Sequence, residues 1–67
     1  MRYLLRLDLE RIRLNLEGTG APHTEHDVAR LLAGFGLWRV NDDWWGADGS
    51  AFKHFLPDDI LESREQG

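Results

Sequence analysis

The sequence predicts a small α+β protein, and three observations support that class. Residues 24–35 have the spacing of a capped amphipathic helix, residues 38–55 hold Trp-rich segments separated by turn residues, and residues 5–16 alternate apolar with polar side chains. With 67 residues the chain has room for one core, so we assign residues 1–67 to a single domain. Residues 63–67 offer nothing to bury and are expected to fray.

The N-terminal segment, residues 3–17, fits either a strand or a helix. The period-two alternation of residues 5–9 resumes one position out of phase in residues 12–16, which indicates a bulged strand or a strand pair. A helix is the alternative, because Leu5, Leu9, Ile12 and Leu16 share one helical face and Gly18 would end it. We favour the strand. A straight strand would span about 46 Å, against a body about 28 Å across, so it would bend, fold back or reach a second copy.

The helix predicted over residues 24–33 has clear start and stop signals. Thr24 is an N-cap residue, and Asp27 stands three positions later, where its side chain can reach back to the cap. Gly34 and Gly36 provide a C-terminal stop. The apolar stripe of this helix consists of Val28, Leu31, Leu32 and Phe35.

The Trp-rich segments predict a three-stranded antiparallel meander over residues 38–40, 44–47 and 50–55. Asp48-Gly49 is a two-residue hairpin signal between the last two strands. In this register Trp45 lies opposite Phe52 on one face of the sheet. Pro57, followed by two acids, predicts the first turn of a short C-terminal helix. The expected core contains Leu5, Leu9, Val28, Leu31, Leu32, Phe35, Trp38, Val40 and Trp44.

Composition excludes several classes of function. The chain has no cysteine, which removes disulfides, iron–sulfur clusters, thiolate zinc sites and cysteine nucleophiles. No apolar run is long enough for an export signal or a membrane span, so we expect a cytoplasmic protein that does not bind membranes. The net charge is −4, with four arginines against three acids in residues 1–20 and four basic residues against nine acids in residues 21–67. This balance makes nucleic acid an unlikely partner.

The predicted function is a non-enzymatic protein-interaction module that self-associates, as a homodimer, or docks on a larger protein. A core this small contributes only about 3–5 kcal/mol unless something else stabilises the chain, and 42% apolar residues with three Trp favour self-association. We expect an exposed aromatic patch at Trp45 and Phe52. An extended N-terminal arm would present Ile12, Leu14 and Leu16 to a neighbouring copy.

Metal and catalytic patterns are weak, and no cofactor is expected. His23 and His26 are three residues apart and are an alternative metal pair, but no HExxH pattern accompanies them and solvated histidines are the simpler interpretation. Ser50, His54 and Asp48 lack the glycine pattern of a nucleophile elbow. The acid-rich turn at residues 42–49 does not match a calcium-binding loop.

Two resemblances suggest an alternative function. Residues 1–8, followed by a helix, the run GFGLWRV at residues 34–40 and a hairpin, resemble the start of small ferredoxin-like nucleases of the VapD type. In those nucleases an acidic residue ending the first strand is catalytic, which implies Asp8 here. The alternative function is therefore a small nuclease or nucleic-acid-binding protein that uses Asp8, and we add His54 as a second candidate. Residues 24–64 are similar in order to double-stranded-RNA-binding folds, including the HicA toxins, although their Gly-Ser-His motif is missing.

Overall fold

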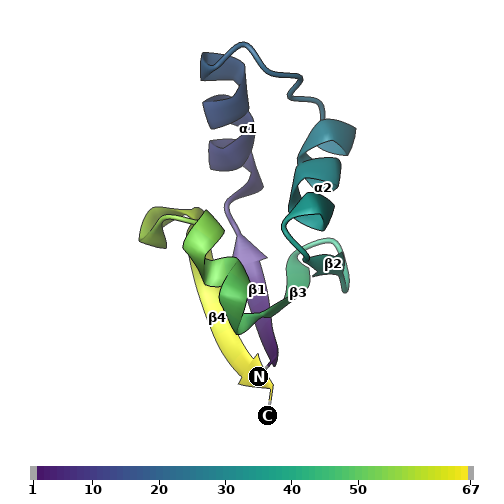
Figure 1. The fold of residues 1–67 in the computed structure, drawn as a ribbon, viewed down its shortest axis with the longest axis vertical. Coiled ribbons are helices and arrows are strands. Elements are labelled where there is room, and N and C mark those ends of the chain that lie inside the picture. The colour runs from purple at the N-terminus through teal and green to yellow at the C-terminus, as the bar shows by residue number, and fades with distance from the viewer. Residues whose placement is uncertain (1, 67) are drawn as a thin grey trace.

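The computed structural model describes residues 2–66 and shows an α+β fold with a four-stranded antiparallel sheet (Figure 1). The helices and strands follow in the order β1 (Arg2–Leu7), α1 (Leu9–Gly18), α2 (Glu25–Gly34), β2 (Trp38–Arg39), β3 (Trp44–Asp48), the 3₁₀ helices η1 (Gly49–His54) and η2 (Pro57–Asp59), and β4 (Ile60–Gln66). The strand order in the sheet is β2-β3-β1-β4.

The N-terminal segment is a strand and a helix in succession. β1 ends at Leu7, and Asp8 is the N-cap of α1, where its side chain accepts a hydrogen bond from the backbone N–H of Arg11 at 3.1 Å. The phase slip after residue 9 is therefore the change from a strand period to a helix period, and the preferred strand through residue 17 is wrong from Leu9 onward. The helical alternative holds for this part, and α1 ends at Gly18.

The second helix is confirmed with its cap. The Thr24 hydroxyl accepts from the N–H of Asp27, and the Asp27 carboxylate accepts from the N–H of Thr24 at 3.0 Å, which forms a complete capping box. Gly36 follows the helix with φ of +90°, in the left-handed region that glycine adopts without strain.

The predicted meander is only partly present. β2 and β3 form a hairpin, in which Trp38 pairs with Gly46 and Arg39 with Trp45. The prediction of a third strand is wrong, because residues 49–54 form η1. On its other side β3 pairs with β1 instead. Long-range pairing with the apolar strand β1 replaces the local hairpin that Asp48-Gly49 suggested.

The C-terminal segment differs from the predicted helix and frayed tail. The helix is limited to the single turn η2, and residues 60–66 form β4 along the free side of β1. This pairing runs from Leu7 opposite Ile60, across a bulge, to Arg2 opposite Gln66. Residues 63–66 therefore belong to the sheet, and Gly67 lies outside the described residues.

The core lies on one face of the sheet and draws on α1, α2 and η1. Leu5 and Leu32 are fully buried. The correspondence with the expected core is limited to Leu5, Val28 and Leu32, with Leu9, Leu31 and Phe35 partly buried around them. Trp38 and Val40 are exposed, and Trp44 is only partly buried, contrary to prediction. The buried apolar residues are Leu5, Leu7, Ile12, Val28, Leu32, Leu37, Trp45, Ala47 and Ala51.

The molecule is elongated because the helices prolong the sheet. Figure 1 shows α1 rising directly from the end of β1, with α2 beside it, so both helices stand largely beyond the ends of the strands. The principal extents are 38 × 20 × 18 Å. Clefts lie along the helix pair, and among the described residues no helix covers the second face of the sheet.

Candidate functional sites

The outer face of the sheet is the side that points away from the core. Side chains alternate between the two faces along β1 and β3. Leu5 and Trp45 point into the core, so Leu4, Arg6 and Trp44 project outward from these two central strands. Val40 continues this face beyond β2, since its N–H donates to the carbonyl of Trp44 at 3.1 Å. We define the outer face by Leu4, Arg6, Trp38, Val40, Trp44, Gly46, Glu62 and Arg64.

The β2–β3 half of the outer face is apolar. Trp38 and Val40 are 43% and 50% exposed. Leu4, Val40 and Trp44 line a shallow hollow of about 220 Å³, with Asn41 and Arg64 as its polar lining. The indole of Trp38 covers Gly46, so closely that a β-carbon on Gly46 would overlap the ring. A glycine at this position therefore lets Trp38 lie against the strand.

The β1–β4 half of the outer face carries charges that are paired with one another. Glu62 lies 3.7 Å from the Arg6 guanidinium and accepts a hydrogen bond from Arg64 Nε at 3.0 Å. The Arg64 guanidinium also lies over the Trp44 ring, 5.1 Å from its centroid. The charged half consequently presents no unpaired basic cluster.

The Trp45 cleft is a second hollow, on the core side, between α1, α2 and the β2–β3 hairpin. Its volume is about 290 Å³, near the lower end of small-molecule sites. It is lined by Leu9, Glu10, Arg13, Glu25, Val28, Ala29, Arg39 and Trp45.

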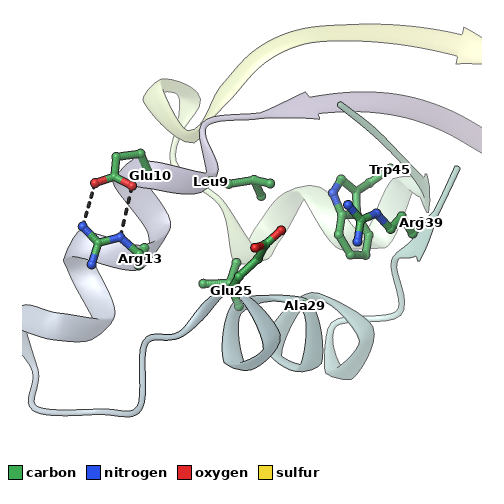
Figure 2. A pocket seen from close by; sticks show the side chains of 8 residues that line it. Leu9, Glu10, Arg13, Glu25, Ala29, Arg39 and Trp45 are labelled. Carbon is green, nitrogen blue, oxygen red and sulfur yellow. Dashed lines mark hydrogen bonds and ion pairs between the residues drawn. The ribbon is translucent and has the colours of Figure 1, made fainter. Parts of the chain in front are cut away.

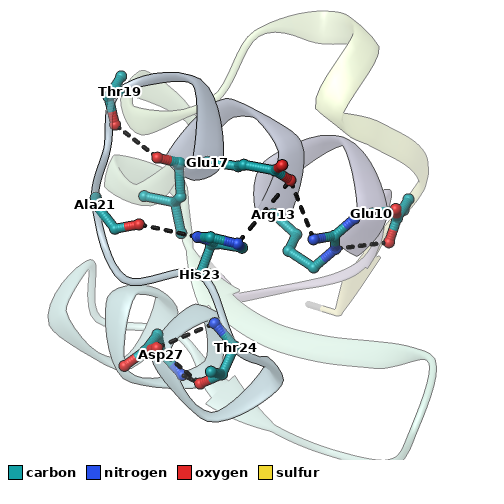
Figure 3. Close-up of polar contacts among 9 residues, drawn as sticks. Glu10, Arg13, Glu17, Thr19, Ala21, His23, Thr24 and Asp27 are labelled. Atoms are coloured by element: carbon teal, nitrogen blue, oxygen red, sulfur yellow. Dashed lines mark hydrogen bonds and ion pairs between the residues drawn. The ribbon is translucent and has the colours of Figure 1, made fainter.

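Polar groups in the Trp45 cleft differ in whether they have partners. Arg13 donates to both carboxylate oxygens of Glu10, at 2.6 and 3.0 Å, and this hydrogen bonding holds the pKa of Glu10 below its ordinary value (Figures 2 and 3). Arg39 lies over the Trp45 ring, 6.0 Å from its centroid, and donates to Asp42 at the edge of the molecule.

Two other groups in the cleft have no partner among residues 2–66. Trp45 is 5% exposed, and its buried indole N–H makes no hydrogen bond in the described chain. The Glu25 carboxylate likewise has no hydrogen bond or ion pair there. Figure 2 shows this carboxylate directed into the space between Leu9 and Trp45, and the indole nitrogen on the side of the ring that faces Leu9.

Trp45 and Phe52 do not form the exposed aromatic patch that the sequence predicts. Trp45 is in the core opposite Leu5, so its ring is not an exposed docking surface. Phe52 is on η1, not on a strand opposite Trp45, and it packs edge to face on Tyr3 with centroids 4.8 Å apart. The exposed aromatic surface belongs to Trp38, which was expected inside.

The predicted N-terminal interface is divided by the helix. Ile12 is buried and Leu16 partly buried on the inner side of α1, while Leu14 is 51% exposed on the opposite side. These three side chains therefore do not form one surface, because a helix turns by about 100° per residue and separates positions 12 and 14.

The alternative catalytic residues have structural partners. Asp8 caps α1, and its backbone N–H donates to the carbonyl of Asp59 at 2.8 Å. The His54 ring stacks on Phe35, with centroids 4.3 Å apart and planes 5° from parallel. Nothing in this arrangement joins Asp8 and His54 in one catalytic constellation.

The alternative metal residues do not gather either. His23 Nδ1 lies 3.1 Å from the carbonyl oxygen of Ala21, and its Nε2 lies 4.0 Å from Glu17 (Figure 3). His26 belongs to the first turn of α2. Within residues 2–66 no group of three or more His, Cys, Asp or Glu side chains is placed to hold a metal ion.

Sequence reasoning missed one buried charged residue. Asp59 is 6% exposed, and its carboxylate accepts from Arg11 Nε and from the Leu56 N–H, each at 2.9 Å. The signal was local: an acid two positions after Pro57 can bond back to the N–H of the residue that precedes the turn. Its long-range partner on α1 had no such signal.

The comparisons add no relative. No protein-family model, curated protein or solved structure matches this chain. None of the helices in the described residues has the length and apolar character to cross a bilayer.

Proposed function

We propose that this protein is a non-enzymatic interaction module that forms a homodimer through the outer face of its sheet. The observation that carries the proposal is the apolar area formed by Leu4, Trp38, Val40 and Trp44 on a sheet face that no helix within residues 2–66 covers. Exposed apolar patches with a polar rim are typical of interaction sites in proteins. Trp is also the residue most enriched among the side chains that dominate binding energy.

A second copy of the chain is the partner that suits this face best. In the charged half Glu62 pairs with both Arg6 and Arg64, which leaves a net charge of only +1, small for attracting a polyanion and of the wrong sign for a basic protein. A two-fold related copy presents the same apolar area and charges that are already paired within each copy, as suits an isologous interface. Association would also add burial to a 67-residue chain that has no disulfide.

The nuclease alternative receives no comparable support. It requires arginines gathered on one surface, whereas Arg11 pairs with Asp59, Arg13 with Glu10 and Glu17, and Arg39 with Asp42. We also propose a cytoplasmic location, because a chain without cysteine needs no oxidising compartment for disulfide formation.

Two lysine substitutions at equally exposed apolar positions test the interface. Val40 and Leu14 are 50% and 51% exposed, so Val40→Lys and Leu14→Lys add the same charge at similar cost to the fold. We expect sedimentation velocity to show a dimer for the wild type and for Leu14→Lys, and a monomer for Val40→Lys. Circular dichroism should be the same for all three.

Two results would contradict the proposal. Dissociation by Leu14→Lys with retention of the dimer in Val40→Lys would move the interface to α1. A wild-type chain that stays monomeric up to about 1 mM, where even weak specific association becomes visible, would remove self-association altogether.

A further inference from the structure

We infer that the Trp45 cleft binds a small aliphatic α-amino acid. Two polar groups in the cleft lack partners within residues 2–66, and the lining holds two acids and two arginines. It is independent of the homodimer, because the cleft lies on the core side of the sheet and the proposed interface is the opposite face.

The anchoring groups are complementary to a zwitterion. The Glu25 carboxylate projects into the cleft without a partner in the described chain and provides an acceptor for an ammonium group (Figure 2). The Trp45 N–H is a buried donor that finds no acceptor within residues 2–66, and leaving such a group unpaired costs free energy that a bound carboxylate would recover. Arg39, which also donates to Asp42, lies over the same ring and adds positive charge at the Trp45 end of the cleft.

The remaining lining sets the size and polarity of the ligand. Leu9, Val28 and Ala29 form the apolar wall, which suits an aliphatic side chain, and the volume of about 290 Å³ admits one small molecule only. Glu10 and Arg13 satisfy each other and add no net charge. Two acids and two arginines in the lining disfavour a ligand that carries a net charge of either sign.

The test uses leucine and two blocked forms of leucine as probes. N-acetylleucine lacks the ammonium group, and leucinamide lacks the carboxylate. Binding is read from the indole N–H resonance of Trp45 in proton–nitrogen NMR spectra, assigned with Trp45→Phe. For a ligand this small we expect saturable leucine binding with a dissociation constant of about 1 mM, and binding of both blocked forms weaker by about tenfold.

Two exposed substitutions assign the groups. Glu25→Gln should weaken leucine about tenfold and leave N-acetylleucine unchanged, because that probe has no ammonium group to lose. Arg39→Gln should weaken leucine and leave leucinamide unchanged. Glu65→Gln, on β4, removes one carboxylate outside the cleft and should change nothing.

Several outcomes would overturn the inference. It fails if leucine up to about 50 mM, far above the expected dissociation constant, gives no saturable shift of the Trp45 indole resonance. Equal binding of leucine and N-acetylleucine would show that the ammonium group is not recognised. Loss of leucine binding in Glu65→Gln to the same degree as in Glu25→Gln would show a non-specific charge effect.

Discussion

Trp38 and Gly46 lie opposite each other on the β2–β3 hairpin, and the Trp38 indole occupies the space that a β-carbon on residue 46 would need. A large exposed aromatic residue is thus held in place by the absence of a side chain on its partner. The shape of the outer face depends on this contact.

Gly46→Ala should displace Trp38 and destabilise the hairpin. The added methyl group overlaps the ring, and overpacking of this kind costs about 1–3 kcal/mol in the free energy of unfolding. Gly18→Ala is the control, because nothing lies within 4 Å of its added β-carbon. Urea unfolding of the two variants gives the comparison. Equal stability of both variants would mean that Trp38 does not lie over Gly46.

Asp59→Ala should destabilise the junction between α1 and β4. Its removal leaves Arg11 Nε and the Leu56 N–H without their acceptor, and an unmade buried hydrogen bond costs about 1–3 kcal/mol. Asp59→Asn keeps an oxygen acceptor and should lose less. Denaturant unfolding of the three proteins measures the difference, and an alanine variant as stable as the wild type would show that these bonds are dispensable.

Leu32→Ala should destabilise the core by about 2–5 kcal/mol, which is comparable with the whole stability of a chain this small. Leu14→Ala removes the same atoms from an exposed position and should change the stability by no more than about 0.5 kcal/mol. Thermal unfolding followed by circular dichroism distinguishes them. Similar losses at both positions would mean that α1 and α2 pack differently.

The start of α2 should depend on pH through Asp27. Hydrogen bonds from the Thr24 hydroxyl and the Thr24 N–H hold the pKa of Asp27 below its ordinary value. The charged form is therefore favoured by folding, and its stabilisation is present above the unfolded-state pKa and disappears as the pH falls through the lower folded-state pKa. Carbon-detected NMR titration of the Asp27 carboxylate measures this directly.

Thr24→Ala provides the control for the titration of Asp27. It removes the hydroxyl donor but keeps the backbone N–H, so the pKa of Asp27 should rise only part of the way to its ordinary value. An ordinary pKa in the wild type would show that the capping box does not form in solution.

The parts of the fold that sequence reasoning predicts well are those decided by near neighbours. The Thr24 and Asp27 capping box needs only a three-residue spacing, and the sequence displays it. The same local logic was available at Asp8, which stands three positions before the N–H it caps. The leucines alternate on both sides of Asp8 and conceal the change of period, so the pattern alone does not show that a strand is followed directly by a helix.

The parts that it predicts poorly are those decided by distant pairing. Alternation shows that Trp44 and Trp45 point to opposite faces, but it does not show which face is covered. Which face is covered depends on distant pairing: Leu5, forty positions away, lies opposite Trp45, and both side chains point into the core. β4 is polar along most of its length, and its place in the sheet comes from the backbone of β1. The Trp45 cleft follows from the same pairing, so its residues carried no advance signal.

The pairing of Arg2 with Gln66 brings the two ends of the described chain together at one pole, while the connection at residues 19–23 lies at the other (Figure 1). Neighbouring residues on antiparallel strands are only about 5 Å apart, so a few glycines and serines would join these ends. The order of the helices and strands along the chain could therefore be changed without changing how they pack in space. A circularly permuted gene with new ends in residues 19–23 should encode the same packing, and the domain should fit into a loop of a host protein with little distortion of the host.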